Sequence, residues 1–174
     1  FPFTEFLCPE SKKEGNSKEF FFREGFYRTT SFKNKKAESP YTENWLNRIT
    51  KTTGTFQDRI PEGITTTWYP DGSKESEGTL KNGLPSGPWI KYYPNGSKQE
   101  TYEFDENGLL SGIKLFYNRE GKIIRNDSIY SGGFLKGIRT NYYPEGNISS
   151  TEEIDHDTLI SYKAYDHKGR LLAS

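Results

Sequence analysis

Apolar residues recur along this chain at a fixed step of 24 or 25 residues. The first column of such positions consists of Phe32, Phe56, Leu80, Phe104, Ile129 and Ile154. A second column consists of Ile60, Leu84, Leu109, Phe134 and Leu159. A repeat of this length is typical of stacked structural units that contribute the same positions to a common core. Both columns are therefore predicted to be buried, with Leu80, Phe104 and Ile129 stacked in adjacent units.

Between these positions the chain repeats a segment that is typical of two strands joined by a tight turn. Four copies begin at a glycine: GITTTWYPDGSK at 63–74, GPWIKYYPNGSK at 87–98, GIKLFYNREGK at 112–122 and GIRTNYYPEGN at 137–147. Proline, then Asp or Asn, then Gly favours a type I turn followed by a left-handed glycine. The sequence therefore predicts a hairpin turn in each copy, with positive φ at Gly72, Gly96, Gly121 and Gly146. Return turns are predicted at Asn82-Gly83, Asn107-Gly108 and Gly132-Gly133.

Side chains alternate between the two faces of a strand, so the residues after each opening glycine divide into two sets. The odd offsets hold Ile64, Thr66, Trp68, Pro88, Ile90, Tyr92, Ile113, Leu115, Tyr117, Ile138, Thr140 and Tyr142. The even offsets hold Thr65, Thr67, Tyr69, Trp89, Lys91, Tyr93, Lys114, Phe116, Asn118, Arg139, Asn141 and Tyr143. The odd set is mostly apolar and is predicted to form the core. The mixed even set is predicted to face solvent or a ligand.

The repeat predicts a single domain over residues 15–174. Within it we expect worn repeats at 15–62, clear repeats at 63–160 and a terminal half-repeat at 161–174. Residues 1–14 show no periodicity and are expected to be a leader segment or an N-terminal cap. The predicted fold class is all-β, an elongated twisted array of antiparallel β-hairpins with 24–25 residues per unit. A helix is expected nowhere except near residues 41–49, where turn signals lapse.

The composition fits a surface-rich β protein. Only 31% of residues are hydrophobic but 16% are aromatic, and aromatic residues favour pleated strands. The 24 basic and 24 acidic side chains balance, which argues against nucleic acid as the partner. No apolar run approaches the roughly 20 residues of a membrane-spanning helix, and the single Cys8 excludes an internal disulfide. The chain starts at Phe1 and lacks methionine. It is either a trimmed piece or a mature chain that has lost a signal peptide, and the latter would place it in the cell envelope or outside the cell.

No arrangement of residues points to catalysis or to a cofactor. His156 stands between Asp155 and Asp157, a pattern that fits a metal ligand or a general base, but a charged return turn explains it more simply. His167 occupies a hairpin-turn position, where a turn role suffices. The glycines recur at the repeat step and serve turns rather than a phosphate-binding loop. The sequence therefore predicts a protein that is not an enzyme and holds no metal.

The order of a glycine, an aromatic-Tyr pair, a turn with Gly, a charged strand and Asn-Gly resembles the MORN-type hairpin repeats. It is most similar to the bacterial variant found in YwqK-like proteins. The resemblance covers about residues 15–172 and is clear over 54–147. It implies successive hairpins that bind or scaffold partners. It also implies a role as the antitoxin component of a toxin–antitoxin pair, which the residues themselves do not indicate.

The candidate binding residues are six of the aromatic and basic members of the even set. They are Tyr69, Trp89, Lys91, Tyr93, Arg139 and Tyr143. Because Tyr, Trp and Arg dominate binding hot spots, the leading hypothesis is a protein-binding module of antitoxin or immunity type. The alternative is a carbohydrate-binding or cell-envelope surface protein whose exposed aromatic rings stack on sugars. Packing of the sheet on itself, which would bury these rings, also stays open.

Overall fold

The computed structural model of the chain describes residues 15–33, 36–57, 60–129 and 134–174. These residues form fourteen β-strands and no helix, so the all-β prediction is confirmed. The expected leader at residues 1–14 and the return turn predicted at Gly132-Gly133 lie outside the described residues.

The chain divides into two compact units, residues 1–85 and 86–174. The first contains β1 (Gly15–Phe21), β2 (Phe26–Lys33), β3 (Lys36–Trp45), β4 (Thr50–Gln57), β5 (Ile60–Trp68) and β6 (Lys74–Lys81). The second contains nearly all of β7 (Leu84–Tyr92), followed by β8 (Lys98–Phe104), β9 (Leu110–Tyr117), β10 (Ile123–Ile129), β11 (Leu135–Tyr142), β12 (Ile148–Asp155), β13 (Thr158–Tyr165) and β14 (Leu171–Ala173). That residues 15–174 act as one domain stays a prediction.

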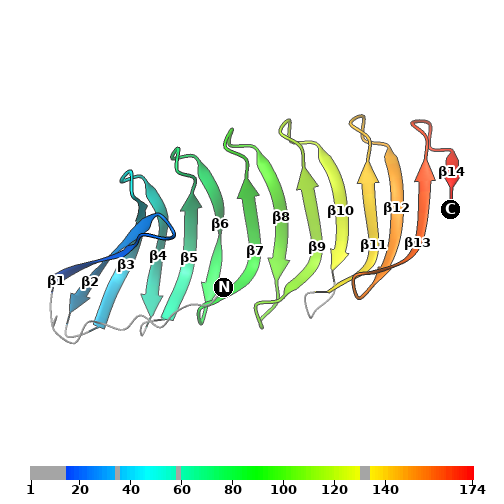
Figure 1. The fold of residues 1–174 in the computed structure, drawn as a ribbon. Coiled ribbons are helices and arrows are strands. Elements are labelled where there is room, and N and C mark those ends of the chain that lie inside the picture. The colour runs from blue at the N-terminus through cyan, green and yellow to red at the C-terminus, as the bar shows by residue number, and fades with distance from the viewer. Residues whose placement is uncertain (1–14, 34–35, 58–59, 130–133) are drawn as a thin grey trace. The chain divides into compact units, whose positions relative to one another are not determined.

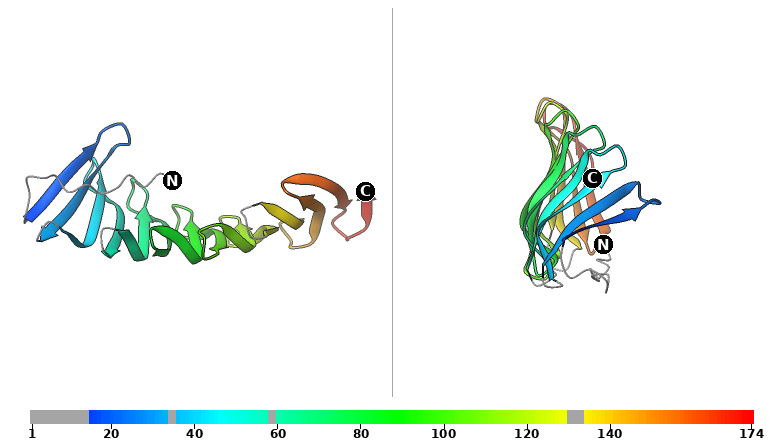
Figure 2. Two further views of the ribbon diagram at one scale, coloured as in Figure 1. Left: turned by 90° about the horizontal axis from the view of Figure 1, so that it is seen from below. Right: turned by 90° about the vertical axis from the view of Figure 1, so that its left-hand side faces the viewer.

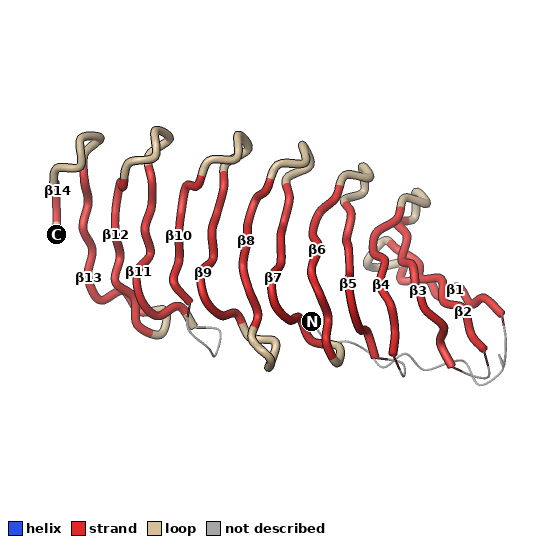
Figure 3. Tube along the Cα trace, turned by 180° about the vertical axis from the view of Figure 1, so that it is seen from behind, coloured by secondary structure: helices blue, strands red, loops and turns tan. Residues whose placement is uncertain are grey.

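Within each unit, every strand pairs antiparallel with the next strand of the chain (Figure 1). The hairpin turns of a unit therefore lie at one end of its strands, and the return turns lie at the other end (Figure 3). Each unit is a single layer of strands, and no other described element of the same unit covers either face of it (Figure 2).

The predicted hairpin turns are confirmed. Gly72, Gly96, Gly121 and Gly146 have φ values of 89°, 83°, 83° and 100°. In the turn after β7, the Gly96 N–H donates to the Tyr93 carbonyl (2.8 Å) and the Tyr93 N–H donates to the Ser97 carbonyl (2.9 Å). This is the type I turn with a following glycine bulge that the Pro-Asn-Gly order favours.

The helix expected near residues 41–49 is wrong, because β3 runs to Trp45 and β4 begins at Thr50. The connection is another turn of the same kind, with Arg48 at a φ of 71° in the position that glycine holds elsewhere. The side-chain oxygen of Asn47 accepts a hydrogen bond from the Ile49 N–H (3.0 Å), which stabilises the bend. The turn therefore forms without Pro or Gly and leaves no signature in the sequence.

The first apolar column lies on the side of the sheet that holds the even set. Cross-strand partners share a face, and Gly87 pairs with Phe104 while Gly137 pairs with Ile154. We call this side the packed face: the even-offset side chains together with the first column. The other side, which carries the odd-offset side chains, is the open face.

Burial confirms the first column only in part. Phe32, Leu80 and Ile154 are buried, each with at most 6% of its surface exposed, whereas Phe104 is half-buried. The side chain of Ile129 lies outside the description. The predicted burial of the second column is wrong, because its members, Ile60, Leu84, Leu109, Phe134 and Leu159, are 42–57% exposed. They flank the return turns, where no second layer among the described residues covers them.

The prediction that the odd set forms the core is also wrong. Ile64 is 74% exposed and Ile113 is 55% exposed, whereas Thr65 of the even set is buried. The pairing of the first column explains the reversal: Leu80 lies opposite Gly63 and Phe104 opposite Gly87, so the column shares its face with the even offsets. A bulge lies beside the opening glycine. Thr101 pairs with Leu115 and Glu103 pairs with Ser111, so residues 112–114 lie opposite a single residue of β8. Gly112 takes a φ of 70° there. The bulge adds two residues and therefore preserves the alternation, which leaves Ile113 on the open face with Leu115.

The turn glycines yield a stability prediction. A Cβ added at Gly96 would have no neighbour within 4 Å, so the cost of Gly96→Ala comes from its positive φ alone. We expect Gly96→Ala to lower the free energy of unfolding by about 1–2 kcal/mol. Gly96→Asn should cost less than half as much, because Asn tolerates the left-handed conformation. Urea unfolding of the three proteins measures this, and an alanine variant as stable as the parent would contradict the turn assignment.

Candidate functional site

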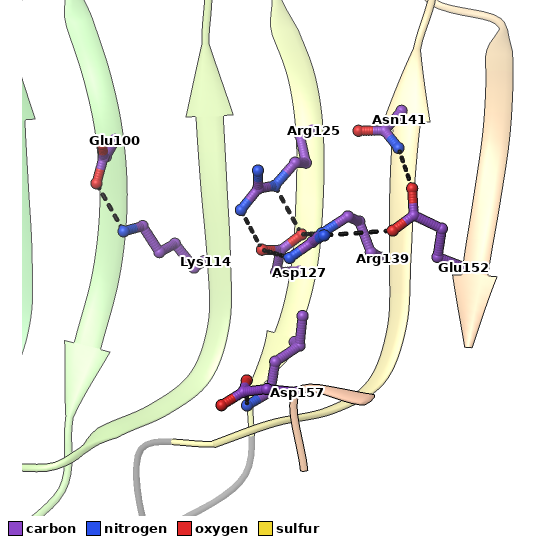
Figure 4. Close-up of polar contacts among 9 residues, drawn as sticks. Glu100, Lys114, Arg125, Asp127, Arg139, Asn141, Glu152 and Asp157 are labelled. Carbon is purple, nitrogen blue, oxygen red and sulfur yellow. Dashed lines mark hydrogen bonds and ion pairs between the residues drawn. The ribbon is translucent and has the colours of Figure 1, made fainter. Parts of the chain in front are cut away.

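A ladder of charged side chains crosses the packed face of the second unit (Figure 4). At one end, the Lys114 amino group on β9 lies 2.7 Å from a carboxylate oxygen of Glu100 on β8. The same amino group lies 5.1 Å from the ring centroid of Tyr102 and 4.8 Å from that of Phe116. Ammonium groups at this distance from a ring are attracted by its quadrupole. The lysine therefore connects two strands through both charge and ring contacts.

Asp127 on β10 lies at the centre of the ladder and is 3% exposed. The guanidinium of Arg125 donates to both of its oxygens, at 2.9 and 2.6 Å. Arg139 on β11 donates through Nε to Oδ1 (3.0 Å) and through Nη1 to Glu152 on β12 (3.2 Å). The carboxylate is thus held by two guanidinium groups, which compensates its burial.

The electrostatics of Arg139 follow from this arrangement. Its partial burial acts to lower the pKa, but the hydrogen bond and charge of Asp127, and then those of Glu152, outweigh the burial and raise the pKa above its usual value. Arg139 therefore stays charged and committed to its two carboxylates. A ligand that bound Arg139, as the sequence predicts, would have to compete with both carboxylates for its guanidinium group.

A second set of contacts joins the tip of one hairpin to the tip of the next. The Tyr93 hydroxyl donates to the Tyr117 carbonyl and the Tyr143 hydroxyl donates to the Tyr165 carbonyl, both at 2.8 Å. In the first unit the Trp45 indole N–H donates to the Trp68 carbonyl at 3.0 Å. We call these three contacts aromatic staples, because each joins a packed-face ring to the main chain of the following hairpin.

Turn amides reinforce the aromatic staples. The Asn95 side-chain amide donates to the Arg119 carbonyl (3.3 Å), and the Asn147 amide donates to the His167 carbonyl (2.7 Å). The His167 ring also stacks on Tyr143, with a centroid separation of 3.9 Å. The terminal half-repeat is thus held to the preceding hairpin through its tip.

The predicted site residues all lie on the packed face and are half-buried: Tyr69, Trp89, Lys91, Tyr93, Arg139 and Tyr143. The structure does not bring them together at one point. Tyr93 and Tyr143 belong to separate staples, and Arg139 belongs to the charged ladder. The Trp89 ring packs edge-on against Phe104 at 5.9 Å, and its buried Nε1 has no acceptor among the described residues.

Sequence reasoning missed a hollow on the open face between β7, β8 and β9. It is lined by side chains that include Pro88, Ile90, Ile113 and Leu115, with Glu103 at its rim. The apolar character of the odd set was visible in the sequence and was interpreted as a buried core. The signal that identifies the faces is the pairing of each opening glycine with a member of the first column, which the spacing alone does not supply.

Neither histidine takes part in a catalytic arrangement. His156 lies in a two-residue return turn at a φ of 47°, with Nδ1 2.9 Å from Asp155. His167 has the same 2.9 Å contact with Glu145 at a hairpin tip. Over the described part of the chain, no group of three or more His, Cys, Asp or Glu residues is placed to hold a metal ion. A search of the same residues finds no helix of the length and hydropathy that a membrane span needs.

The fold and its contacts define a protein of antiparallel hairpin repeats linked tip to tip. Residues 61–82 and 85–106 match the family model of the MORN repeat variant, so these two segments are similar to repeats of the MORN type. No curated protein matches the chain.

Removal of one staple hydroxyl should lower the free energy of unfolding by the contribution of one hydrogen bond. We expect Tyr143→Phe to lower the free energy of unfolding by about 1 kcal/mol, because the ring and its stacking on His167 remain. The control is Tyr162→Phe on β13, where the hydroxyl belongs to a more exposed side chain. Urea unfolding that shows equal stability for the two variants would contradict the role of the staple.

A substitution at the centre of the charged ladder should lower the free energy of unfolding by more than the loss of a staple hydroxyl does. Asp127→Asn leaves two guanidinium groups without their shared carboxylate and should cost about 2–4 kcal/mol. A matched control is Asp71→Asn in a hairpin turn, because Asn95 accepts the same backbone hydrogen bond at the equivalent position of the next turn. Chemical denaturation should show a loss for the first variant only, and equal losses would contradict the assignment.

Proposed function

We propose that this chain is a non-enzymatic repeat scaffold that binds a partner protein along the open face of its second unit. The observation that carries the proposal is the apolar hollow of Pro88, Ile90, Ile113 and Leu115 on a face that no other strand of the same unit covers. Contiguous exposed apolar surface on a folded chain marks interaction sites.

The chemistry of the hollow suggests what the partner presents. Ile113 is 55% exposed at its edge, and Ile138, two strands away, is 45% exposed. Apolar side chains of a partner would fill the hollow and cover both isoleucines. Glu103 is exposed at the rim and would favour a basic residue beside that anchor.

The packed face is a second candidate surface for the same function. Its proposed residues are Tyr69, Trp89, Lys91, Tyr93, Arg139 and Tyr143. Because two tyrosine hydroxyls and the Arg139 guanidinium are committed within the sheet, this face would offer ring surfaces and the Lys91 ammonium rather than free hydrogen-bonding groups.

The resemblance to the bacterial MORN variant suggests which partner to test first. It makes a toxin the first candidate, and the chain would then act as the antitoxin or immunity partner. Binding across an exposed sheet face would neutralise a toxin by covering its surface, without any chemical step.

The test uses purified chain, immobilised, with a candidate toxin or with another protein identified by mass spectrometry after capture. Ile113→Lys should weaken binding at least about ten-fold, the effect expected of a hot-spot residue. Glu106→Lys in an exposed return turn is the control for an added lysine, and Lys91→Glu probes the packed face. Loss of binding in Lys91→Glu but not in Ile113→Lys would move the site to the packed face. Unchanged binding in both variants would overturn both surfaces.

A further inference from the structure

A row of tyrosines crosses the open face of the second unit beside the hairpin turns. Tyr92, Tyr117 and Tyr142 are the last residues of β7, β9 and β11, at successive steps of 25 residues. Each is half-exposed. We infer that this tyrosine row binds an uncharged, extended β-1,4-linked polysaccharide.

The spacing of the row is set by the sheet. Neighbouring strands lie about 4.8 Å apart, so side chains at equivalent positions of alternate strands lie about 10 Å apart. The staple from Tyr93 fixes the Tyr117 carbonyl, and the staple from Tyr143 begins one residue after Tyr142. The main chain that carries the row is therefore held at each hairpin tip.

Apolar residues lie beside two of the three rings, whereas Lys98 lies opposite Tyr92. On β10 the residues beside Tyr117 are Ile123 and Ile124, and on β12 the residue opposite Tyr142 is Ile148. The ion pairs of these strands are gathered on the packed face, in the ladder from Lys114 to Glu152. A neutral ligand complements the row at Tyr117 and Tyr142, whereas an acidic polysaccharide would meet one cation, Lys98, at the Tyr92 end.

Two amide side chains beside the row each carry an oxygen that accepts no hydrogen bond from the described residues. The Gln99 Oε1 and the Asn126 Oδ1 have no hydrogen-bond partner among the described residues. Gln99 lies between the residues paired with Tyr92 and Phe116, and Asn126 pairs with Leu115 and Thr140 of the open face. Both oxygens are buried, so a sugar hydroxyl would reach them after the amide turns outward. Such hydroxyls would supply the missing donors.

The geometry selects the type of linkage. A β-1,4-linked pyranose chain in its extended form turns the same face outward at every second sugar, a repeat similar to two strand spacings. The C–H faces of such sugars are apolar and pack on aromatic rings. An α-1,4-linked chain coils, so it would contact one ring and leave the others. A ligand of six β-linked sugars would cover all three tyrosines.

The test measures binding of cellohexaose and chitohexaose to the purified chain by calorimetry, with maltohexaose as the α-linked control. Both β-linked hexamers should bind, each at least about ten-fold more tightly than its disaccharide, because each further ring adds a stacking contact. Equal binding of maltohexaose, or no binding of either β-linked hexamer at millimolar concentration, would overturn the inference.

Three variants test whether a bound sugar lies on the tyrosine row. Tyr117→Leu should weaken binding at least about ten-fold, whereas Tyr117→Phe, which keeps the ring, should stay within about three-fold. Tyr162→Leu is the matched control, since Tyr162 pairs with Glu152 and lies on the packed face. Circular dichroism and urea unfolding verify that each variant is folded, and equal loss in Tyr117→Leu and Tyr162→Leu would contradict the site.

The glycan inference and the proposed protein partner stand independently. Ile113→Lys tests the hollow, and the tyrosine variants test the row. If the tyrosine variants weaken protein capture and the parent binds no β-linked sugar, the row belongs to the protein-binding surface and the glycan assignment is overturned. If the sugars bind and no protein does, the proposed protein partner fails instead.

Discussion

Within each unit, a hairpin is held in place by the hairpin that follows it, through a ring donor that reaches a main-chain carbonyl at the neighbouring tip. The constraint behind this arrangement is that each unit is a single layer of strands, with no second layer of its own among the described residues. A sheet without a second layer has little interior in which to bury apolar area, and few large side chains here are buried. Stability therefore depends on contacts made sideways, between adjacent strands. Backbone pairing, the aromatic staples and the charged ladder all act in that direction.

The two faces consequently have different roles. The packed face commits its polar groups to the neighbouring strands, with Asp127 held between two guanidinium groups and the tyrosine hydroxyls used by the staples. The open face presents exposed isoleucines and the half-exposed tyrosines of the row, beside two buried amide oxygens that have no partner among the described residues. A scaffold that binds ligands needs exposed apolar surface, and the open face supplies it.

The sequence predicted the hairpin turns because their chemistry is local. Pro, Asn or Asp, and Gly set the backbone angles of adjacent residues, so the positive φ at Gly96 follows from a short segment. The burial of Leu80 and Ile154 followed from the repeat step alone. The assignment of the core to the odd set failed because the buried column pairs with the opening glycines, as Leu80 does with Gly63, and the repeat step does not reveal this pairing. The same limit applied to Tyr93: a ring next to basic residues suggested a ligand site, but its hydroxyl reaches a carbonyl 24 residues away.

The account is tested most directly by native-state hydrogen exchange of Tyr93→Phe. The Tyr93 hydroxyl binds the Tyr117 carbonyl, and the next turn closes through the N–H groups of Asn118 and Gly121. Loss of a hydrogen bond worth about 1 kcal/mol should speed exchange of those two amides roughly three- to ten-fold. The Gly146 amide, in the turn that follows, should keep the exchange rate of the parent. Unchanged exchange at Asn118 and Gly121, or an equal increase throughout the unit, would contradict a structure held together hairpin by hairpin.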